Sequence, residues 1–303
     1  MQPLVIAHRG APCERPEHTG SSYRIAIRRG ADLVEPDVVP TRDGVLLVRH
    51  EPGLASTTDI ALRPRFADRR RSDASGASEW FAEDFDWEEL RDLRAVERLP
   101  ELRPRSAAHS GAEPPLRLRE LVRIVTAEAE ARVRRCGIVV ELKHDARSLA
   151  LGFDYAELLV RELEGLAGLD ALRDLRVESF EEAALDRLRG AGCGAARILL
   201  IETDAARRPE EAGERWLTPD GLDEAARRFD GISLRASLLG VDTGHPEQGR
   251  GLVAAAHARG LEVLAYTFRT EDEFLPERFR GRPAEYRAAL LGTGIDGLFT
   301  DEV

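Results

Sequence analysis

The 303-residue sequence contains no asparagine and only one lysine. Because asparagine is absent, the chain has no N-x-S/T acceptor for N-glycosylation. The lone lysine is Lys143, and the rest of the 44 basic side chains are arginines. Chance survival of one surface lysine is the simple explanation. We interpret Lys143 instead as a position that needs a compact ammonium where a planar guanidinium does not fit.

Cysteine is scarce as well, and the three cysteines are Cys13, Cys136 and Cys193. Their odd number, their wide spacing and the lack of a C-x-x-C pair predict reduced thiols rather than a disulfide framework or a zinc site. Residues 1–10 lead directly into a strand-like segment, without a basic region or a long apolar region before it. We therefore expect a cytoplasmic protein without stable membrane insertion.

Acidic side chains outnumber basic ones by 55 to 44, so the net charge is -11 at pH 7. This charge repels nucleic acid, so a nucleic-acid partner is not expected. An enzyme with this charge can still act on an anionic phosphodiester if a local cation overrides the global field at the site. The composition is thus a first indication of a bound metal ion.

The chain, 43% hydrophobic, is long enough for one large α/β domain. Short apolar runs alternate with helical stretches, which indicates βαβ units and a parallel sheet. Strands are expected at residues 4–8, 32–37, 138–142, 175–180, 197–202, 230–234, 261–267 and 296–300. Helices are expected at 19–29, 154–166, 181–190, 220–229, 248–259 and 284–291. This alternation predicts a (β/α)8 TIM barrel over residues 1–303; a doubly wound sheet is the alternative, weakened by the absence of a glycine-rich dinucleotide fingerprint.

Two segments depart from the barrel rhythm. Asp43-Gly44 is a hairpin signal, and residues 45–50 form a returning strand that brings His50 back toward Glu35 and Asp37. Residues 52–115 are rich in Pro, Ser, Gly and Arg and contain one expected helix at about 87–96. We interpret them as an insertion over the barrel mouth, after the hairpin of the second strand.

Polar residues gather where the expected strands end. Barrel enzymes place their sites at the C-terminal ends of the strands, and residues two apart on a strand point to the same side. The candidates that meet at this end are His8, Arg9, Glu35, Asp37, His50, Glu141 and Lys143.

These residue types suit the hydrolysis of a phosphodiester. Three carboxylates are hard oxygen ligands, which fit one Ca²⁺ or Mg²⁺ better than zinc. Histidines have a pKa near neutrality, so His8 and His50 are candidates for the acid and the base. Arg9 and Lys143 are candidates for binding the non-bridging oxygens. Each residue alone also has a structural reading, for example a simple ion pair between Glu141 and Lys143.

The chain resembles the glycerophosphodiester phosphodiesterase family, and in particular its bacterial glycerol-phosphate-scavenging branch. The resemblance rests on HRGAPCERPEHT (8–19), GADLVEPDVVPTRDGVLLVRHE (30–51), VVELK (139–143), ESF (178–180), AYTFR (265–269) and DGLFTD (296–301). It implies a (β/α)8 barrel that releases glycerol 3-phosphate and an alcohol from a small glycerophosphodiester.

By position, the resemblance implies that His8 and His50 are the acid and base pair and that Glu35, Asp37 and Glu141 bind the metal. Arg9 and Lys143 would contact phosphate. A further hypothesis is that the neighbouring glycerol hydroxyl attacks phosphorus first and that water then opens a cyclic phosphate.

Some positions depart from the family pattern. Pro36 stands between two metal carboxylates, Glu51 replaces the usual aspartate after His50, and Glu178 stands where an amide is common. The proline restricts the backbone and removes a donor, and Glu178 adds a carboxylate that either strengthens the metal site or alters its ion preference. We interpret Glu17 and His18 as helix-entry residues.

Two rival functions remain at this point. One is a related barrel that cleaves phospholipid headgroups, such as a lysophospholipase D or a phosphatidylinositol-type phospholipase C. For it, Trp80, Phe81, Phe85 and Trp87 are the candidate lipid contact. The other is an inactive barrel that binds a phosphate ligand. Headgroup preference and oligomeric state are not encoded in any pattern of the sequence.

Overall fold

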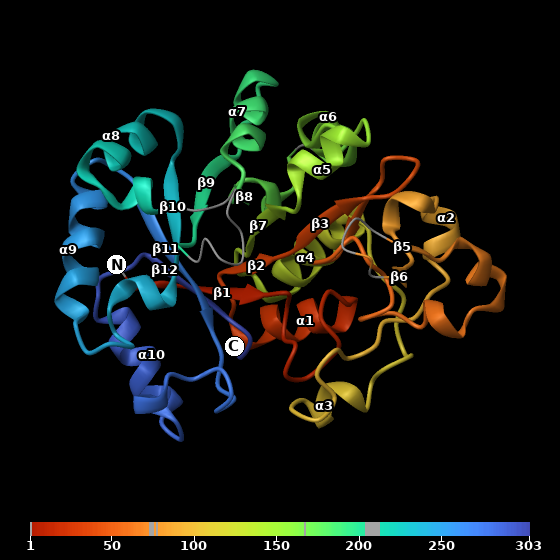
Figure 1. Ribbon diagram of the computed structural model, residues 1–303, viewed down its shortest axis with the longest axis horizontal. Helices are drawn as coiled ribbons and strands as arrows, with labels where there is room; N and C mark the ends of the chain where they lie inside the picture. Colours follow the sequence, from red (N-terminus) through yellow and green to blue (C-terminus); the bar gives the residue numbers. More distant parts are fainter. Residues whose placement is uncertain (1, 73–75, 77, 167, 204–212) are drawn as a thin grey trace.

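Eight parallel strands form a closed barrel with helices around it, which confirms the predicted (β/α)8 fold (Figure 1). The computed structural model describes residues 2–72, 76, 78–166, 168–203 and 213–303. β1 (Leu4–His8) lies between β2 (Leu33–Glu35) and β12 (Gly297–Thr300), so the first and last strands are neighbours. The other barrel strands are β7 (Gly137–Leu142), β8 (Leu175–Ser179), β9 (Ala196–Ile201), β10 (Gly231–Arg235) and β11 (Glu262–Phe268).

The second barrel strand is interrupted at Pro36, whereas one continuous strand over 32–37 was predicted. β2 pairs with β1 and β7, and β3 (Asp37–Pro40) continues along β7 beyond the proline. The interruption has a physical cause, because proline has no N–H for the ladder and a fixed φ. The predicted hairpin follows as β4 (Leu46–Val48), antiparallel to β3. The backbone N–H of Arg49 donates to the carbonyl of Asp37 at 2.8 Å, which places the following residue, His50, beside Asp37.

The predicted helices on the barrel begin and end within three residues of their expected bounds. α1 (Gly20–Arg29) begins after Thr19, whose side chain accepts from the backbone N–H of Ser22, and ends at Gly30 with φ 107°. The other helices around the barrel are α5 (Asp145–Ala150), α6 (Tyr155–Leu163), α7 (Glu182–Gly190), α8 (Pro219–Arg228), α9 (Pro246–His257) and α10 (Pro283–Leu291).

One long helix was not predicted. α4 (Leu118–Arg132) fills the stretch between the insertion and β7 and packs against α1. Its buried residues include Leu118, Leu121, Val122 and Val125, which recur at helical spacing on one face. The apolar periodicity needed to find this helix was therefore present in the sequence.

The described part of residues 52–115 forms a lobe with a hydrophobic core of its own. The lobe contains the 3-10 turns η1 (Ile60–Leu62), η2 (Pro64–Arg69) and η3 (Ala82–Asp84), the short pair β5 (Arg71–Ser72) and β6 (Ser78–Glu79), and the helices α2 (Trp87–Leu90) and α3 (Pro104–Ala107). Its buried core includes Leu54, Ile60, Phe66, Phe85 and Leu90, together with Val39 and Leu47 of the β3–β4 hairpin. In Figure 1 it extends to one side of the barrel, next to that hairpin.

The helix expected at about 87–96 is shorter than predicted, because α2 ends at Leu90. Beyond it the backbone pairs with other segments instead of with itself. The N–H of Ala95 donates to the carbonyl of Glu113 at 2.8 Å, and the N–H of Val96 donates to the carbonyl of Thr57 at 2.9 Å. These non-local hydrogen bonds override the local helical pattern.

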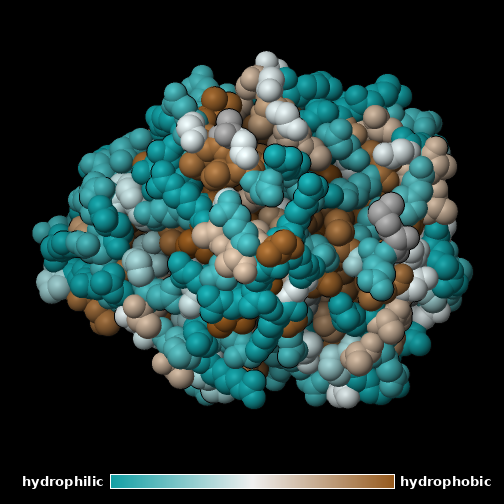
Figure 2. Space-filling model, turned by 180° about the vertical axis from the view of Figure 1, so that it is seen from behind, coloured by the Kyte–Doolittle hydropathy of each residue, from teal (hydrophilic) through white to brown (hydrophobic). Residues whose placement is uncertain are grey.

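The aromatic cluster of the lobe is internal. Trp80, Phe81, Phe85 and Trp87 are all buried, with exposed fractions of 0 to 7%. On the face shown in Figure 2, hydrophilic residues cover most of the surface and hydrophobic ones lie in several small groups among them. Across the described ranges of the chain, no helix combines the length and the apolar character that crossing a membrane requires.

Candidate active site

A cavity of about 170 Å³ opens among the C-terminal ends of the barrel strands. Of the seven predicted site residues, six line it: His8, Arg9, Glu35, His50, Glu141 and Lys143. Asp37 does not reach the cavity surface; it is fully buried and contacts Arg9 and Lys143 from behind. The strand ends therefore converge as the barrel geometry predicts.

The turn after β1 depends on a glycine. Gly10 has φ 92°, and a Cβ at this position would lie 2.5 Å from the hydroxyl oxygen of Ser22. The same hydroxyl accepts from the backbone N–H of Ala11 at 2.8 Å. Only glycine fits this close approach with a left-handed backbone, and the turn presents the side chains of His8 and Arg9 to the cavity.

Buried carboxylates crowd one wall of the cavity. Glu35, Glu141 and Glu178 each offer a ligand atom, and these atoms lie within 4.8 Å of one another. Oε1 of Glu35 and Oε2 of Glu178 are buried and accept no hydrogen bond from the described residues. Oε1 of Glu141 and Oδ1 of Asp37 instead face the ammonium of Lys143. Burial and mutual repulsion raise the pKa of Glu35 and Glu178 well above the usual value, and burial raises that of Glu141 to about 7.

This donor set fits a divalent cation such as Ca²⁺ or Mg²⁺. Carboxylates that repel one another in a buried site are stabilised when a metal ion neutralises them, and oxygen-only ligands suit hard ions. Glu35 and Glu141 were predicted as ligands, whereas Glu178 was noted only as an additional carboxylate. Its place is decided by the register of β8 on β7, where Glu178 lies opposite Glu141.

Asp37 has an environment different from that of the other three carboxylates. Its Oδ1 lies 3.0 Å from the Nζ of Lys143, and its Oδ2 lies 3.3 Å from Nε of Arg9 and 3.0 Å from Nε2 of His18. Burial would raise the pKa of Asp37, but Lys143, His50 and Arg9 together hold it well below the usual value. Asp37 is therefore the ionised carboxylate at the centre of a cluster of cationic and imidazole side chains.

Lys143 connects two of the predicted ligands. Besides Asp37, its Nζ lies 2.6 Å from Oε1 of Glu141, and the side chain is buried. The alternative reading of Glu141 and Lys143 as an ion pair is thus realised, but the pair is buried and lines the cavity. A point charge with three donors suits this position between two carboxylates better than a planar guanidinium.

Both histidines at the cavity are held by a carboxylate at Nδ1. His8 Nδ1 lies 2.5 Å from Oδ1 of Asp301, and His50 Nδ1 lies 2.7 Å from Oε1 of Glu51. A carboxylate at Nδ1 stabilises the tautomer that carries its proton there and leaves the Nε2 lone pair available. The sequence analysis included Asp301 in the DGLFTD motif but predicted no role for it. Glu51 was noted only as a departure from the family pattern.

The environment keeps both imidazoles neutral near pH 7. Burial, supported by Arg9, lowers the pKa of His8 to about 4, although Asp301 opposes the shift. Burial also lowers the pKa of His50 to about 3, with Arg9 and Lys143 acting in the same direction. A neutral imidazole is the form that accepts a proton.

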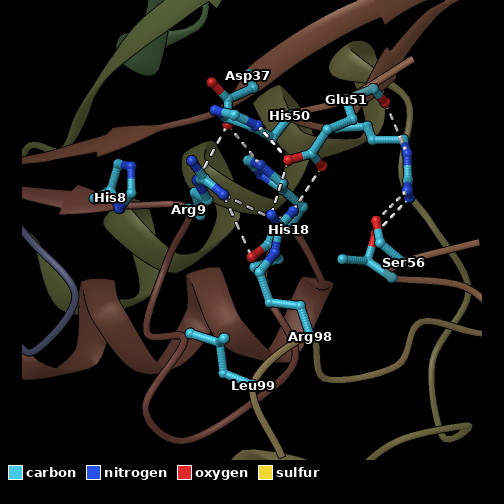
Figure 3. A network of polar contacts seen from close by, with 12 residues as sticks. His8, Arg9, His18, Asp37, His50, Glu51, Ser56, Arg98 and Leu99 are labelled. Atoms are coloured by element: carbon cyan, nitrogen blue, oxygen red, sulfur yellow. Dashed lines mark hydrogen bonds and ion pairs between the residues drawn. The ribbon is translucent and has the colours of Figure 1, made fainter. Parts of the chain in front are cut away.

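Figure 3 shows how the loop after β1 joins this network. His18 is buried; its Nε2 lies 3.0 Å from Asp37, and its Nδ1 lies 2.7 Å from the hydroxyl of Tyr23. Glu17 accepts from Nη1 of Arg9 at 3.2 Å and from Nη2 of Arg98 at 2.6 Å. Both residues precede the N-cap Thr19, as predicted, and their side chains also belong to the site.

Comparisons with known proteins agree with the predicted family. The model of the glycerophosphoryl diester phosphodiesterase family matches residues 8–303. The glycerophosphodiester phosphodiesterase GDPD6 of Arabidopsis thaliana is 31% identical over 99% of this chain and 84% of its own length. A glycerophosphodiester phosphodiesterase of Haemophilus influenzae is 26% identical over 98% of this chain and 87% of its own.

Solved structures share the barrel. A glycerophosphodiester phosphodiesterase from Agrobacterium tumefaciens aligns with a TM-score of 0.61 at 20% identity, covering 99% of this chain and 96% of its own. A phosphodiesterase from Oleispira antarctica, solved in complex with the product sn-glycerol-3-phosphate, aligns with a TM-score of 0.66 at 20% identity over 99% and 93%.

The barrel and the sequence matches together define an enzyme that hydrolyses phosphodiesters. The chain belongs to the glycerophosphoryl diester phosphodiesterase family, over almost its whole length.

Proposed function

We propose that the protein hydrolyses small glycerophosphodiesters to glycerol 3-phosphate and an alcohol, using His8 and His50 as the acid and base pair. The observation that carries this proposal is the pairing of each histidine with its own carboxylate, at 2.5 Å and 2.7 Å. Both pairs lie beside a cavity whose wall includes Glu35 and Glu178, each with one buried oxygen that accepts no hydrogen bond from the described residues. Family membership and the product named for the Oleispira relative support the same substrate class.

In this mechanism Glu35, Asp37 and Glu141 would hold one divalent cation, as the family resemblance implies. Glu178 would offer a further oxygen, because its carboxylate lies within 4.8 Å of those of Glu35 and Glu141. The cation would supply charge neutralisation at a non-bridging phosphate oxygen. Arg9 and Lys143 line the cavity and present N–H donors toward the ester. Their own carboxylate partners keep these cations in place before the substrate arrives.

The histidines move protons at Nε2. One takes the proton of the attacking oxygen, and the other donates a proton to the oxygen of the departing alcohol. Because both imidazoles are neutral in the free protein, the one that acts as the acid must first gain a proton. An anionic phosphate within hydrogen-bond distance favours this protonation. We further propose that the attacking oxygen is the neighbouring glycerol hydroxyl, giving a cyclic phosphate that water opens.

The first experiment compares headgroup release from glycerophosphocholine, glycerophosphoethanolamine and lysophosphatidylcholine, before and after treatment with a chelator. We expect the two glycerophosphodiesters to be hydrolysed, the lysophospholipid to be spared, and chelated enzyme to recover when Ca²⁺ or Mg²⁺ returns. The buried aromatic cluster of the lobe favours this result over a lipid substrate. His8→Ala or His50→Ala enzyme with wild-type rates would contradict the assignment.

A second experiment identifies the metal ligands without relying on activity. Metal binding is measured by calorimetry for the wild type, Asp37→Asn and Glu178→Gln. A loss of affinity confined to Asp37→Asn supports the ligand set Glu35, Asp37 and Glu141. A loss confined to Glu178→Gln supports the ligand set Glu35, Glu141 and Glu178 instead. The cyclic intermediate has its own test, since direct attack by solvent would incorporate ¹⁸O in a single step with inversion at phosphorus.

A further inference from the structure

One segment of the insertion passes directly beside the two histidine-holding carboxylates. This segment, residues 97–106, leaves the lobe core and includes the start of α3. The buried side chain of Glu97 links the two ends of the segment: it accepts from the backbone N–H of Leu99 at 2.8 Å and from the hydroxyl of Ser106. The N–H of Arg103 donates to the carbonyl of Leu99 at 2.8 Å. Hydrogen bonds within the 97–106 segment thus stabilise its conformation.

Arg98, in this segment, binds Glu51, the carboxylate that holds His50. Arg98 binds Glu51 with both nitrogens of its fork, Nη1 to Oε1 at 2.8 Å and Nη2 to Oε2 at 2.8 Å. Oε1 of the same carboxylate lies 2.7 Å from Nδ1 of His50. A bidentate guanidinium fixes the plane of a carboxylate, so Arg98 determines where Glu51 points. Figure 3 shows Arg98 and Glu51 within this network.

Arg103, in the same segment, binds Asp301, the carboxylate that holds His8. Arg103 donates from Nη2 to Oδ2 of Asp301 at 2.5 Å, while Oδ1 of Asp301 binds Nδ1 of His8. The same guanidinium donates from Nε to Glu271 at 2.7 Å. Arg103 is 5% exposed and Asp301 is 1% exposed, so water does not compete for either partner. One oxygen of the carboxylate thus serves the arginine and the other serves the histidine.

We propose that Arg98 and Arg103 are positioning residues for the reaction, through which the insertion holds the two histidines in their reactive orientation. Each arginine keeps its carboxylate ionised and oriented, and the carboxylate keeps the proton on Nδ1 and the lone pair of Nε2 toward the cavity. Such outer partners of a reactive histidine are typically worth about 10 to 100-fold in activity. The proposal rests on the proposed roles of His8 and His50, and it makes the insertion part of the catalytic apparatus.

The two arginines differ in how far their carboxylate depends on them. Asp301 has a second cation from the barrel, because Nε of Arg269 lies 3.0 Å from its Oδ2. Within the ranges that the structure describes, the ion pairs of Glu51 are those with His50 and Arg98. Loss of Arg98 is therefore expected to cost about 10 to 100-fold in kcat, and loss of Arg103 less than about tenfold.

The kinetic test uses Arg98→Gln, Arg98→Lys, Arg103→Gln and Arg103→Lys, with Arg105→Gln as the matched control. Arg105 lies in the same segment, but its side chain is 81% exposed and its nearest carboxylate, Glu14, is 3.7 Å away. We expect both glutamine variants to lose kcat with KM within about twofold, because the contacts orient the histidines and do not touch substrate. Lysine restores the positive charge but not the bidentate geometry of the guanidinium. We therefore expect Arg98→Lys to recover less of the lost kcat than Arg103→Lys does.

A spectroscopic test separates positioning from a general structural role. The chain has 7 histidines, so a protein with ¹⁵N-labelled histidine gives a spectrum simple enough to report the tautomer of each ring. Spectra of His8→Gln and His50→Gln assign the two relevant signals. We expect Arg98→Gln to shift the ring nitrogens of His50 and Arg103→Gln to shift those of His8, each without moving the other. Shifts in both rings, or in neither, overturn the proposal.

Failure of this inference and failure of the proposed function give different results. If His8→Gln and His50→Gln retain wild-type rates, the proposed histidine roles are wrong. If those variants are inactive while Arg98→Gln and Arg103→Gln match the wild type in kcat and in the histidine spectrum, only the positioning role is overturned. If a glutamine variant does not fold, the decision rests on Arg98→Lys, whose kcat and His50 signals are compared with those of Arg105→Gln.

Discussion

Replacing Asp301 by asparagine changes the proton arrangement of His8 while leaving the shape of the side chain intact. Oδ2 of Asp301 accepts from Nη2 of Arg103 at 2.5 Å and lies 3.0 Å from Nε of Arg269 in an ion pair, and Oδ1 faces His8. An amide has one oxygen and one NH₂ group. Its oxygen must face the two arginines, because the NH₂ group would oppose the N–H donor of Arg103 and the positive charge of Arg269. The NH₂ group then faces Nδ1 of His8.

This orientation disables His8 in either catalytic role. Its Nδ1 must accept from the amide, so its single proton moves to Nε2, where a base needs a lone pair. As an acid, His8 would need protons on both nitrogens, which the amide N–H opposes. The same substitution in a serine protease triad, where the aspartate also binds Nδ1, lowers kcat by about 10⁴-fold through the wrong tautomer. We expect a loss of about 10³-fold or more for Asp301→Asn, equivalent to about 4 kcal/mol in the barrier.

The substitution also removes a buried negative charge from two arginines. Leaving buried charges without their partner typically costs about 3 kcal/mol in the free energy of unfolding, which thermal or urea denaturation measures. Because the fold must persist for the kinetic result to be informative, both measurements are made on the same preparation. KM is expected to change little, since Asp301 does not line the cavity.

Asp296→Asn is the matched control. Asp296 precedes the same strand, β12, at the opposite end of the barrel, and its Oδ2 lies 2.8 Å from Nε2 of His257. Both side chains are about 40% exposed, at 40% and 39%. This second Asp–His pair is expected to tolerate the amide with wild-type kcat. An Asp301→Asn enzyme within tenfold of the wild-type kcat would refute the tautomer argument.

Three further predictions concern the metal site, the lobe and pH. Glu141→Gln is expected to weaken Ca²⁺ or Mg²⁺ binding by at least about tenfold, measured by calorimetry, because it removes a charged oxygen ligand. Phe85→Ala is expected to lower the free energy of unfolding by about 3 to 5 kcal/mol in urea, because Phe85 is fully buried in the lobe core; no change would mean that the lobe does not unfold with the barrel. For Glu17, burial alone would raise the pKa, but Arg9 and Arg98 lower it from 4.5 to about 2. Its stabilisation is therefore present above pH 4.5 and lost as pH falls toward 2, so the stability difference between wild type and Glu17→Gln should vanish across that window.

Local patterns were sufficient for the barrel and for much of its site. Apolar runs of strand length separated by helical stretches identified the strands, since parallel strands buried on both faces have this composition. Because the C-terminal ends of such strands meet at one mouth, polar residues at those ends could be grouped before any contact was known. His8, Glu35, Glu141 and Lys143 were found in this way and line the cavity.

Some local features were available and were still misread. The periodicity of α4 lies within residues 118–132. Pro36 was recognised as a constraint, but its interruption of the strand between Glu35 and Asp37 was not. In these places the sequence contained the physical signal, namely helical spacing in the first case and a missing ladder donor in the second.

Other features were decided only by the tertiary structure. Asp301 and His8 are separated by 293 positions, and Arg98 and Glu51 by 47. No spacing rule connects such pairs, because closure of the barrel and the path of the insertion bring them together. The order of residues thus determined which chemical groups reach the mouth of the barrel. Packing decided which carboxylate holds which histidine, since that depends on distances between segments that no local pattern encodes.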